Sequence, residues 1–71
     1  MEGPINVVSS NVQAIAYEED SKTLIIWFNN EYTYSYTGVS PEVWEAFKNS
    51  ASKGKFVASN IKGKYAFSRV R

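Results

Sequence analysis

A β-hairpin predicted over Lys22–Gly38 constrains the fold of this chain more than any other stretch. Two segments rich in β-branched and aromatic residues, 22–28 and 32–38, flank the short polar sequence Asn29-Asn30-Glu31, a pattern typical of hairpins. The second segment alternates strictly, with tyrosines on one face and threonine or serine on the other. The first segment is apolar on both faces, which is typical of a central strand.

The alternation also predicts how the two strands pair. A three-residue turn places Phe28 opposite Tyr32, whereas a two-residue turn would set the aliphatic face against the small polar residues. Because a slip of one residue moves every side chain to the other face, the pattern favours the three-residue turn. We expect Asn29 and Asn30 to supply the left-handed backbone that such a turn needs. The predicted core face is Leu24, Ile26, Phe28, Tyr32, Tyr34 and Tyr36.

The preceding segment, Val12–Glu18, is predicted to be a further antiparallel strand. Pairing Tyr17 with Thr23 would turn Ala14 and Ala16 toward the core, where small residues let a helix approach closely. The outer face of the sheet would then carry four large apolar side chains: Ile15, Tyr17, Ile25 and Trp27.

The hydrophobic period changes after Gly38. Ser40 is a favourable N-cap and Pro41 suits the first helical position, which predicts a helix from Pro41 to about Ser50. Its apolar stripe is expected to cover the tyrosine face. A short second helix is predicted around 56–61, ending near Gly63.

Both ends of the chain allow a further strand. The segment 5–8 is expected to add a short edge strand, and 64–71 is either an extended segment at the sheet edge or a loose tail. The predicted fold class is α+β: an antiparallel β-meander of three to four strands packed against one main helix and a short second helix. Residues 1–71 are expected to form a single domain.

The composition argues against several kinds of function. The chain has no cysteine and no histidine, so disulfides, thiolate metal sites and the commonest metal ligand and general base are excluded. We therefore predict no catalytic residue, no metal site, no cofactor and no enzyme activity. No apolar run approaches the roughly 20 residues that span a bilayer, and no secretory signal is recognisable. The expected protein is cytoplasmic and makes no membrane contact.

Charge is distributed unevenly along the sequence. All seven acidic residues lie within residues 1–48, whereas residues 49–71 contain no acid. This asymmetry indicates an anionic partner, RNA or DNA, whose phosphates need only clustered cations. The candidate nucleic-acid-binding residues are Lys53, Lys55, Lys62, Lys64, Arg69 and Arg71. The alternative is a solvated basic surface that pairs with the acidic turn 18–20.

The outer sheet face predicts a different function. An exposed patch centred on Trp27 is typical of a protein-interaction surface, so a protein partner, a homodimer or an inhibitor of phage or host origin are the alternatives to nucleic acid. In a second alternative, Phe67 and Val70 fold over this patch and cover it. The tyrosine stripe offers a platform for stacking bases, but the predicted register turns its rings toward the helix, which favours core packing.

Several blocks of the sequence resemble the KTSC domain family: Ser10–Tyr17, Thr23–Phe28, Tyr34–Ser40 and Ser52–Phe56, followed by Asn60, Ile61 and Tyr65. The family is named for its occurrence at the C-terminus of some lysyl-tRNA synthetases, and it also occurs as small stand-alone bacterial and phage proteins. The resemblance implies an α+β fold and no established catalytic residues, and it suggests RNA by association. Ile25 and Trp27 depart from the polar residues expected on the outer face.

Overall fold

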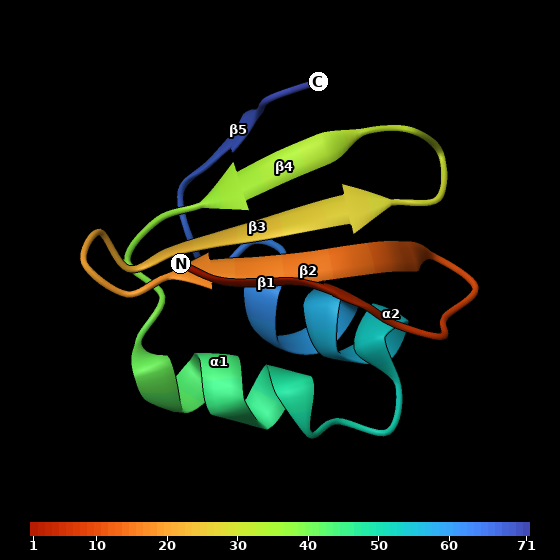
Figure 1. Ribbon diagram of the computed structural model, residues 1–71, viewed down its shortest axis with the longest axis horizontal. Helices are drawn as coiled ribbons and strands as arrows, with labels where there is room; N and C mark the ends of the chain where they lie inside the picture. Colours follow the sequence, from red (N-terminus) through yellow and green to blue (C-terminus); the bar gives the residue numbers. More distant parts are fainter.

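The computed structural model describes residues 1–71 as one five-stranded antiparallel sheet with its helices on one face (Figure 1). The strands follow one another across the sheet in sequence order: β1 (Glu2–Asn6), β2 (Val12–Glu18), β3 (Thr23–Phe28), β4 (Thr33–Tyr36) and β5 (Phe67–Arg69). Between β4 and β5 the chain forms α1 (Pro41–Lys48), α2 (Lys53–Phe56) and the π-helical turn η1 (Val57–Ile61). The predicted α+β meander is confirmed, with more strands than expected. No helix is both long and apolar enough to cross a bilayer.

The central hairpin pairs as predicted. Ile26 lies opposite Tyr34, and Leu24 lies opposite Tyr36. The three-residue turn is closed by the Phe28 backbone N–H, which donates to the carbonyl oxygen of Tyr32 at 2.9 Å. Strict alternation in one strand was therefore enough to fix the register.

The backbone of this turn differs from the prediction. The residue with left-handed backbone is Glu31, at φ 73°, and neither Asn29 nor Asn30 has a positive φ. Three-residue hairpin turns commonly place the left-handed residue last, after a type I turn. Asn30 stabilises the turn through its side chain instead, since its Oδ1 accepts a hydrogen bond from the Tyr32 backbone N–H at 3.1 Å.

The predicted register of β2 against β3 was wrong by one residue. Tyr17 lies opposite Leu24 rather than Thr23, and Ile15 lies opposite Ile26. A four-residue turn, 19–22, replaces the predicted five-residue one, because Glu18 pairs with Thr23. The observed register turns the larger side chains of Ile15 and Tyr17 toward the helices, where they remove more apolar surface from water than alanines would, while Ala14 and Ala16 are buried on the other face.

A bulge in β2 allows a third large residue to join them. Val12 pairs with Phe28, but Ala14 already pairs with Trp27, so Gln13 is an extra residue in the strand. Strict alternation would place positions 12 and 15 on opposite faces, and the bulge brings both to the core face. Val12 and Ile15 are each only 1% exposed.

The core lies between the sheet and the helices. The rings of Tyr17 and Trp44 stack with centroids 5.4 Å apart, which places α1 beneath β2. The Tyr17 hydroxyl donates to the Val39 carbonyl oxygen, so this buried phenol is satisfied. The buried core cluster comprises Val12, Ile15, Tyr17, Leu24, Ile26, Tyr36, Val39, Trp44, Phe47, Val57 and Ile61.

Glu2 on β1 fastens the edge of the sheet to α1. Its carboxylate accepts a hydrogen bond from the Trp44 indole N–H at 2.8 Å and pairs with Lys48 at 2.5 Å. Lys48 also pairs with Glu45 in its own helix. The hydrogen bonds from Lys48 and then Trp44 hold the pKa of Glu2 below its usual value. Those from Glu2 and Glu45 raise the pKa of Lys48.

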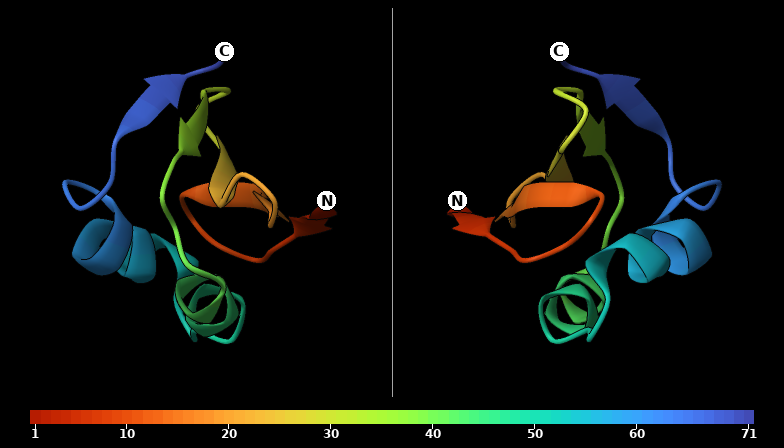
Figure 2. Two further views of the ribbon diagram at one scale, coloured as in Figure 1. Left: turned by 90° about the vertical axis from the view of Figure 1, so that its left-hand side faces the viewer. Right: turned by 90° about the vertical axis from the view of Figure 1, so that its right-hand side faces the viewer.

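The C-terminal half follows the predicted order with shifted boundaries. Ser40 caps α1 as predicted, and Ser52 caps the second helix, which begins at Lys53 and continues into η1 as far as Ile61. Beyond η1 the chain returns to the sheet as β5, along the edge of β4 (Figure 2). The extended alternative for the C-terminal segment is thus confirmed.

Candidate functional site

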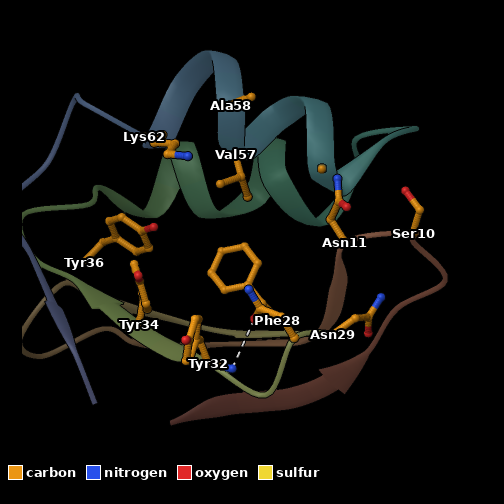
Figure 3. Close-up of a pocket in the computed structure, with 12 residues that line it drawn as sticks. Ser10, Asn11, Phe28, Asn29, Tyr32, Tyr34, Tyr36, Val57, Ala58 and Lys62 are labelled. Carbon is orange, nitrogen blue, oxygen red and sulfur yellow. Dashed lines mark hydrogen bonds between the residues drawn. The ribbon is translucent and has the colours of Figure 1, made fainter. Parts of the chain in front are cut away.

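A groove of about 580 Å³ lies between the sheet and the α2–η1 segment (Figure 3). Phe28 occupies its middle, facing Val57 of η1 across the groove. Its walls come from the β1–β2 loop, the β3–β4 hairpin and the second helical segment. The lining residues are Ser10, Asn11, Phe28, Asn29, Asn30, Tyr32, Tyr34, Tyr36, Gly54, Val57, Ala58 and Lys62.

Aromatic rings form the sheet side of this groove. The ring of Tyr34 meets Phe28 edge to face at 5.7 Å and lies parallel to the ring of Phe67 at 5.6 Å. Tyr32 is 43% exposed and Phe67 is 59% exposed. Because Phe67 stacks on Tyr34, it lies on the tyrosine face and does not cover the outer face of the sheet. We call Phe28, Tyr32, Tyr34 and Phe67 the aromatic face.

The tyrosine stripe therefore divides between core and groove, whereas core packing of the whole stripe was predicted. Tyr36 is buried, Tyr34 is half-buried and Tyr32 is exposed. The helices leave part of the β4 side uncovered because α1 packs beneath β2 through the Tyr17–Trp44 stack. The sequence analysis offered the stripe as a platform for stacking bases but favoured core packing, so it did not predict this groove. The available signal was the aromatic character of positions 32 and 67.

Two cations lie at the groove. Lys62, just after η1, lines the groove and directs its side chain into it (Figure 3). The Arg69 guanidinium lies over the ring of Tyr32, 4.8 Å from its centroid, which is cation–π geometry. Both residues belong to the six cations predicted to bind nucleic acid.

The other four predicted cations are more dispersed. Lys53 and Lys55 line a neighbouring hollow of about 420 Å³ beside Ser10 and Asn11. Lys64 is exposed in the turn after η1, and Arg71 ends the chain, held to Thr33 by backbone hydrogen bonds. The ion pairs in the structure use Met1 and Lys48, so none of the six cations is neutralised by a carboxylate.

Acidic side chains gather at the far end of β3. A hollow of about 500 Å³ there is lined by Glu2, Glu18, Glu19, Asp20 and Glu45, among other residues. This hollow adjoins the turn before β3, whereas the groove adjoins the turn after it. No group of three or more acidic residues is arranged to hold a metal ion. Carboxylates therefore line this hollow, whereas none lines the groove.

The predicted outer-face surface forms only in part. Ile15 and Tyr17 are 1% and 2% exposed in the core, because β2 pairs one residue away from the predicted register. Ile25 and Trp27 do lie on the outer face, opposite Ser35 and Thr33, and both are half-buried. Two of the four predicted interface residues thus remain on that face.

The single sheet with both helices on one face defines a small α+β domain, and comparison with known proteins identifies its family. Residues 8–65 match the model of the KTSC domain. The chain belongs to the KTSC domain family. A crystal structure of a KTSC domain protein from Yersinia pestis superimposes with a TM-score of 0.92 at 34% identity, covering 94% of each chain.

A longer protein also contains a similar segment. A lysine–tRNA ligase from Nostoc punctiforme is 36% identical over 61 residues, which is 86% of this chain. The match covers 11% of the ligase, so the chain spans about a ninth of the length of this relative.

Proposed function

We propose that this KTSC domain is a non-enzymatic module that binds single-stranded RNA in the aromatic groove. The observation that carries the proposal is the Arg69–Tyr32 pair beside a groove that also holds Lys62. Proteins that bind single strands combine cations for the phosphates with aromatic rings on which bases stack. Six unpaired cations in the last third of the chain supply the electrostatic component.

Two further observations support an RNA ligand. No carboxylate side chain is among the residues that line the groove. The similar segment in a protein named as a lysine–tRNA ligase is consistent with a role at RNA. Double-stranded RNA presents no free base faces, so the groove should discriminate against it.

Fluorescence anisotropy with a labelled single-stranded RNA of about 12 nucleotides tests the proposal. Binding should be measurable at about 50 mM salt and weaken steeply by about 200 mM. Tyr32→Ala should lower affinity, whereas Tyr32→Phe keeps the ring and should bind nearly as well. Equal binding by Tyr32→Ala, or no binding at low salt, would refute the proposal. The affinities for single-stranded DNA and for duplex RNA of the same sequence measure how much the 2′-hydroxyl and base pairing affect binding.

The alternative function is a protein-interaction or homo-oligomerisation module that uses the outer face around Trp27. It is supported by the position of Ile25 and Trp27 on that face, and weakened by the burial of Ile15 and Tyr17. Sedimentation equilibrium over a wide concentration range tests self-association, and Trp27→Ser should abolish it. A monomer throughout, together with RNA binding, would exclude homo-oligomerisation in favour of the first function.

A further inference from the structure

The groove has two chemically different ends on either side of Phe28. At one end lie Asn11 and Asn29, and at the other lie Lys62 and Tyr36 (Figure 3). A nucleotide has the same division, with a flat base that presents donors and acceptors at one end and an anionic phosphate at the other. The volume of about 580 Å³ falls within the range of roughly 300–1,000 Å³ typical of small-ligand sites.

The amide end has hydrogen-bonding capacity that the protein does not use. The Asn29 side-chain N–H donates to the Ser9 carbonyl oxygen at 3.1 Å, which fixes the amide and leaves its Oδ1 as a free acceptor. Asn11 contacts Ser9 only through its backbone N–H, so the carbonyl oxygen and the NH2 group of its side-chain amide are both free. Its side chain lies against Gly54, where an added Cβ would come within 3.0 Å of Nδ2. A free amide is a donor–acceptor pair of the kind that binds the edge of a base.

The cationic end suits a phosphate. The ammonium group of Lys62 is a triple donor without a carboxylate partner. Tyr36 lines the groove beside it, and its phenol hydroxyl is a hydrogen-bond donor at neutral pH. Phosphate contacts position a strand and base-edge contacts provide sequence preference.

We infer that the groove holds one unpaired nucleotide of a single-stranded RNA, with its base edge read by Asn11 and its phosphate at Lys62. The base would lie against the ring of Phe28, between the sheet and η1. This inference rests on the proposed function and adds base preference to it. Backbone binding alone would not distinguish one base from another.

The test compares five RNA strands of equal length that are abasic except at one central position. That position carries adenine, guanine, cytosine, uracil or no base. We expect at least one base to bind five-fold or more tightly than the abasic strand, and the four bases to differ among themselves. Equal affinity for all five strands would overturn base reading while leaving backbone binding in place. Absence of binding by every strand and by an ordinary RNA would overturn the proposed function itself.

Single-residue variants test the roles assigned to Asn11 and Lys62 at the two ends of the groove. Asn11→Ala should reduce the differences among the four bases to less than two-fold, while the abasic strand binds as before. Asn60→Ala removes an exposed amide of η1 that does not line the groove and should leave the ranking intact. Lys62→Gln should weaken all five strands by a similar factor. An unchanged ranking in the Asn11 variant, with native circular dichroism, would overturn the assignment.

Discussion

The ring of Phe67 lies parallel to the ring of Tyr34, within 2° and with centroids 5.6 Å apart. One ring belongs to the last strand and the other to the central hairpin, so this stack joins the C-terminal edge to the aromatic face. Phe67 remains 59% exposed despite the stack. It therefore presents an outward surface on which a base can lie.

Phe67→Ala should weaken RNA binding more than it weakens the fold. Base–aromatic stacking contributes about 1–3 kcal/mol per base, which corresponds to roughly 5- to 150-fold in affinity. The measurement is anisotropy of the labelled strand, with thermal unfolding of the same samples. Val70→Ala is the matched control, since Val70 is 64% exposed and follows the same strand. Equal loss of affinity in both variants would argue against a specific role for the Phe67 ring.

Lys62→Gln should reduce the salt dependence of binding. For single strands each neutralised phosphate contributes a slope of about −0.7 in log K against log salt. Losing one contact should therefore make the slope less negative by about 0.7. Lys22→Gln is the matched control, because Lys22 belongs to the turn before β3, close to the acidic residues and away from the residues that line the groove. If the two variants give the same slope, Lys62 does not contact phosphate.

Ile15→Val tests the register of β2. Ile15 is buried in the core, so loss of one methyl should cost about 0.5–1.5 kcal/mol of unfolding free energy. Ile25→Val changes the same group on the half-buried outer face and should cost less. Urea denaturation of both variants gives the comparison. In the predicted but incorrect register both residues would lie on the outer face, and the two variants would lose similar amounts of stability.

Glu31→Gly should stabilise the protein. A non-glycine residue at φ 73° carries left-handed strain of about 1–2 kcal/mol, which glycine relieves. Glycine in turn loses more backbone entropy on folding, which offsets about 0.5–1 kcal/mol of that gain. We expect a net gain of about 0.5–1 kcal/mol in urea denaturation. Asn30→Gly, at a position without positive φ, should destabilise the turn instead. A loss of stability in the Glu31 variant would contradict the assigned backbone.

Glu2→Gln should remove a pH-dependent part of the stability. The pKa of Glu2 is lowered in the folded state, chiefly by the hydrogen bond from Lys48. Its stabilisation is therefore fully present above the unfolded pKa of about 4.3 and is lost as pH falls through the lower folded value. The pKa of Lys48 is raised, so its contribution persists until pH exceeds the unfolded value of about 10.4.

Thermal unfolding as a function of pH measures this effect. The difference in Tm between wild type and Glu2→Gln should be constant near neutral pH and shrink in acid. Glu19→Gln, in the exposed turn after β2, should show no comparable convergence. A difference that stays constant from neutral pH down to about pH 3 would mean that Glu2 acts by packing alone.

Patterns with a single physical solution were predictable from the sequence. Tyr32, Tyr34 and Tyr36 alternate with small polar residues, so only one pairing with β3 buries the large side chains. Ser40-Pro41 fixed the start of α1 because few residues suit those two positions. The sequence blocks that resemble the KTSC family implied the same α+β architecture.

Features that depend on long-range packing were not predictable. Both faces of β2 are apolar, and the choice between Ile15 and Ala16 for the core depends on a bulge at Gln13 and on the length of the next turn. The groove depends on how much of the sheet the helices cover, which alternation along a strand cannot indicate. The amides of Asn11 and Asn29 reach it from loops that are far apart in the sequence.

Carboxylates gather around the turn before β3, whereas Lys62 and Arg69 border the groove and no carboxylate lines it. As a polyanion approaches, its field orients such a molecule so that the groove faces the polyanion and the carboxylates point away from it. Productive encounters then become more frequent without any added contact, and the gain disappears as added salt shortens the Debye length.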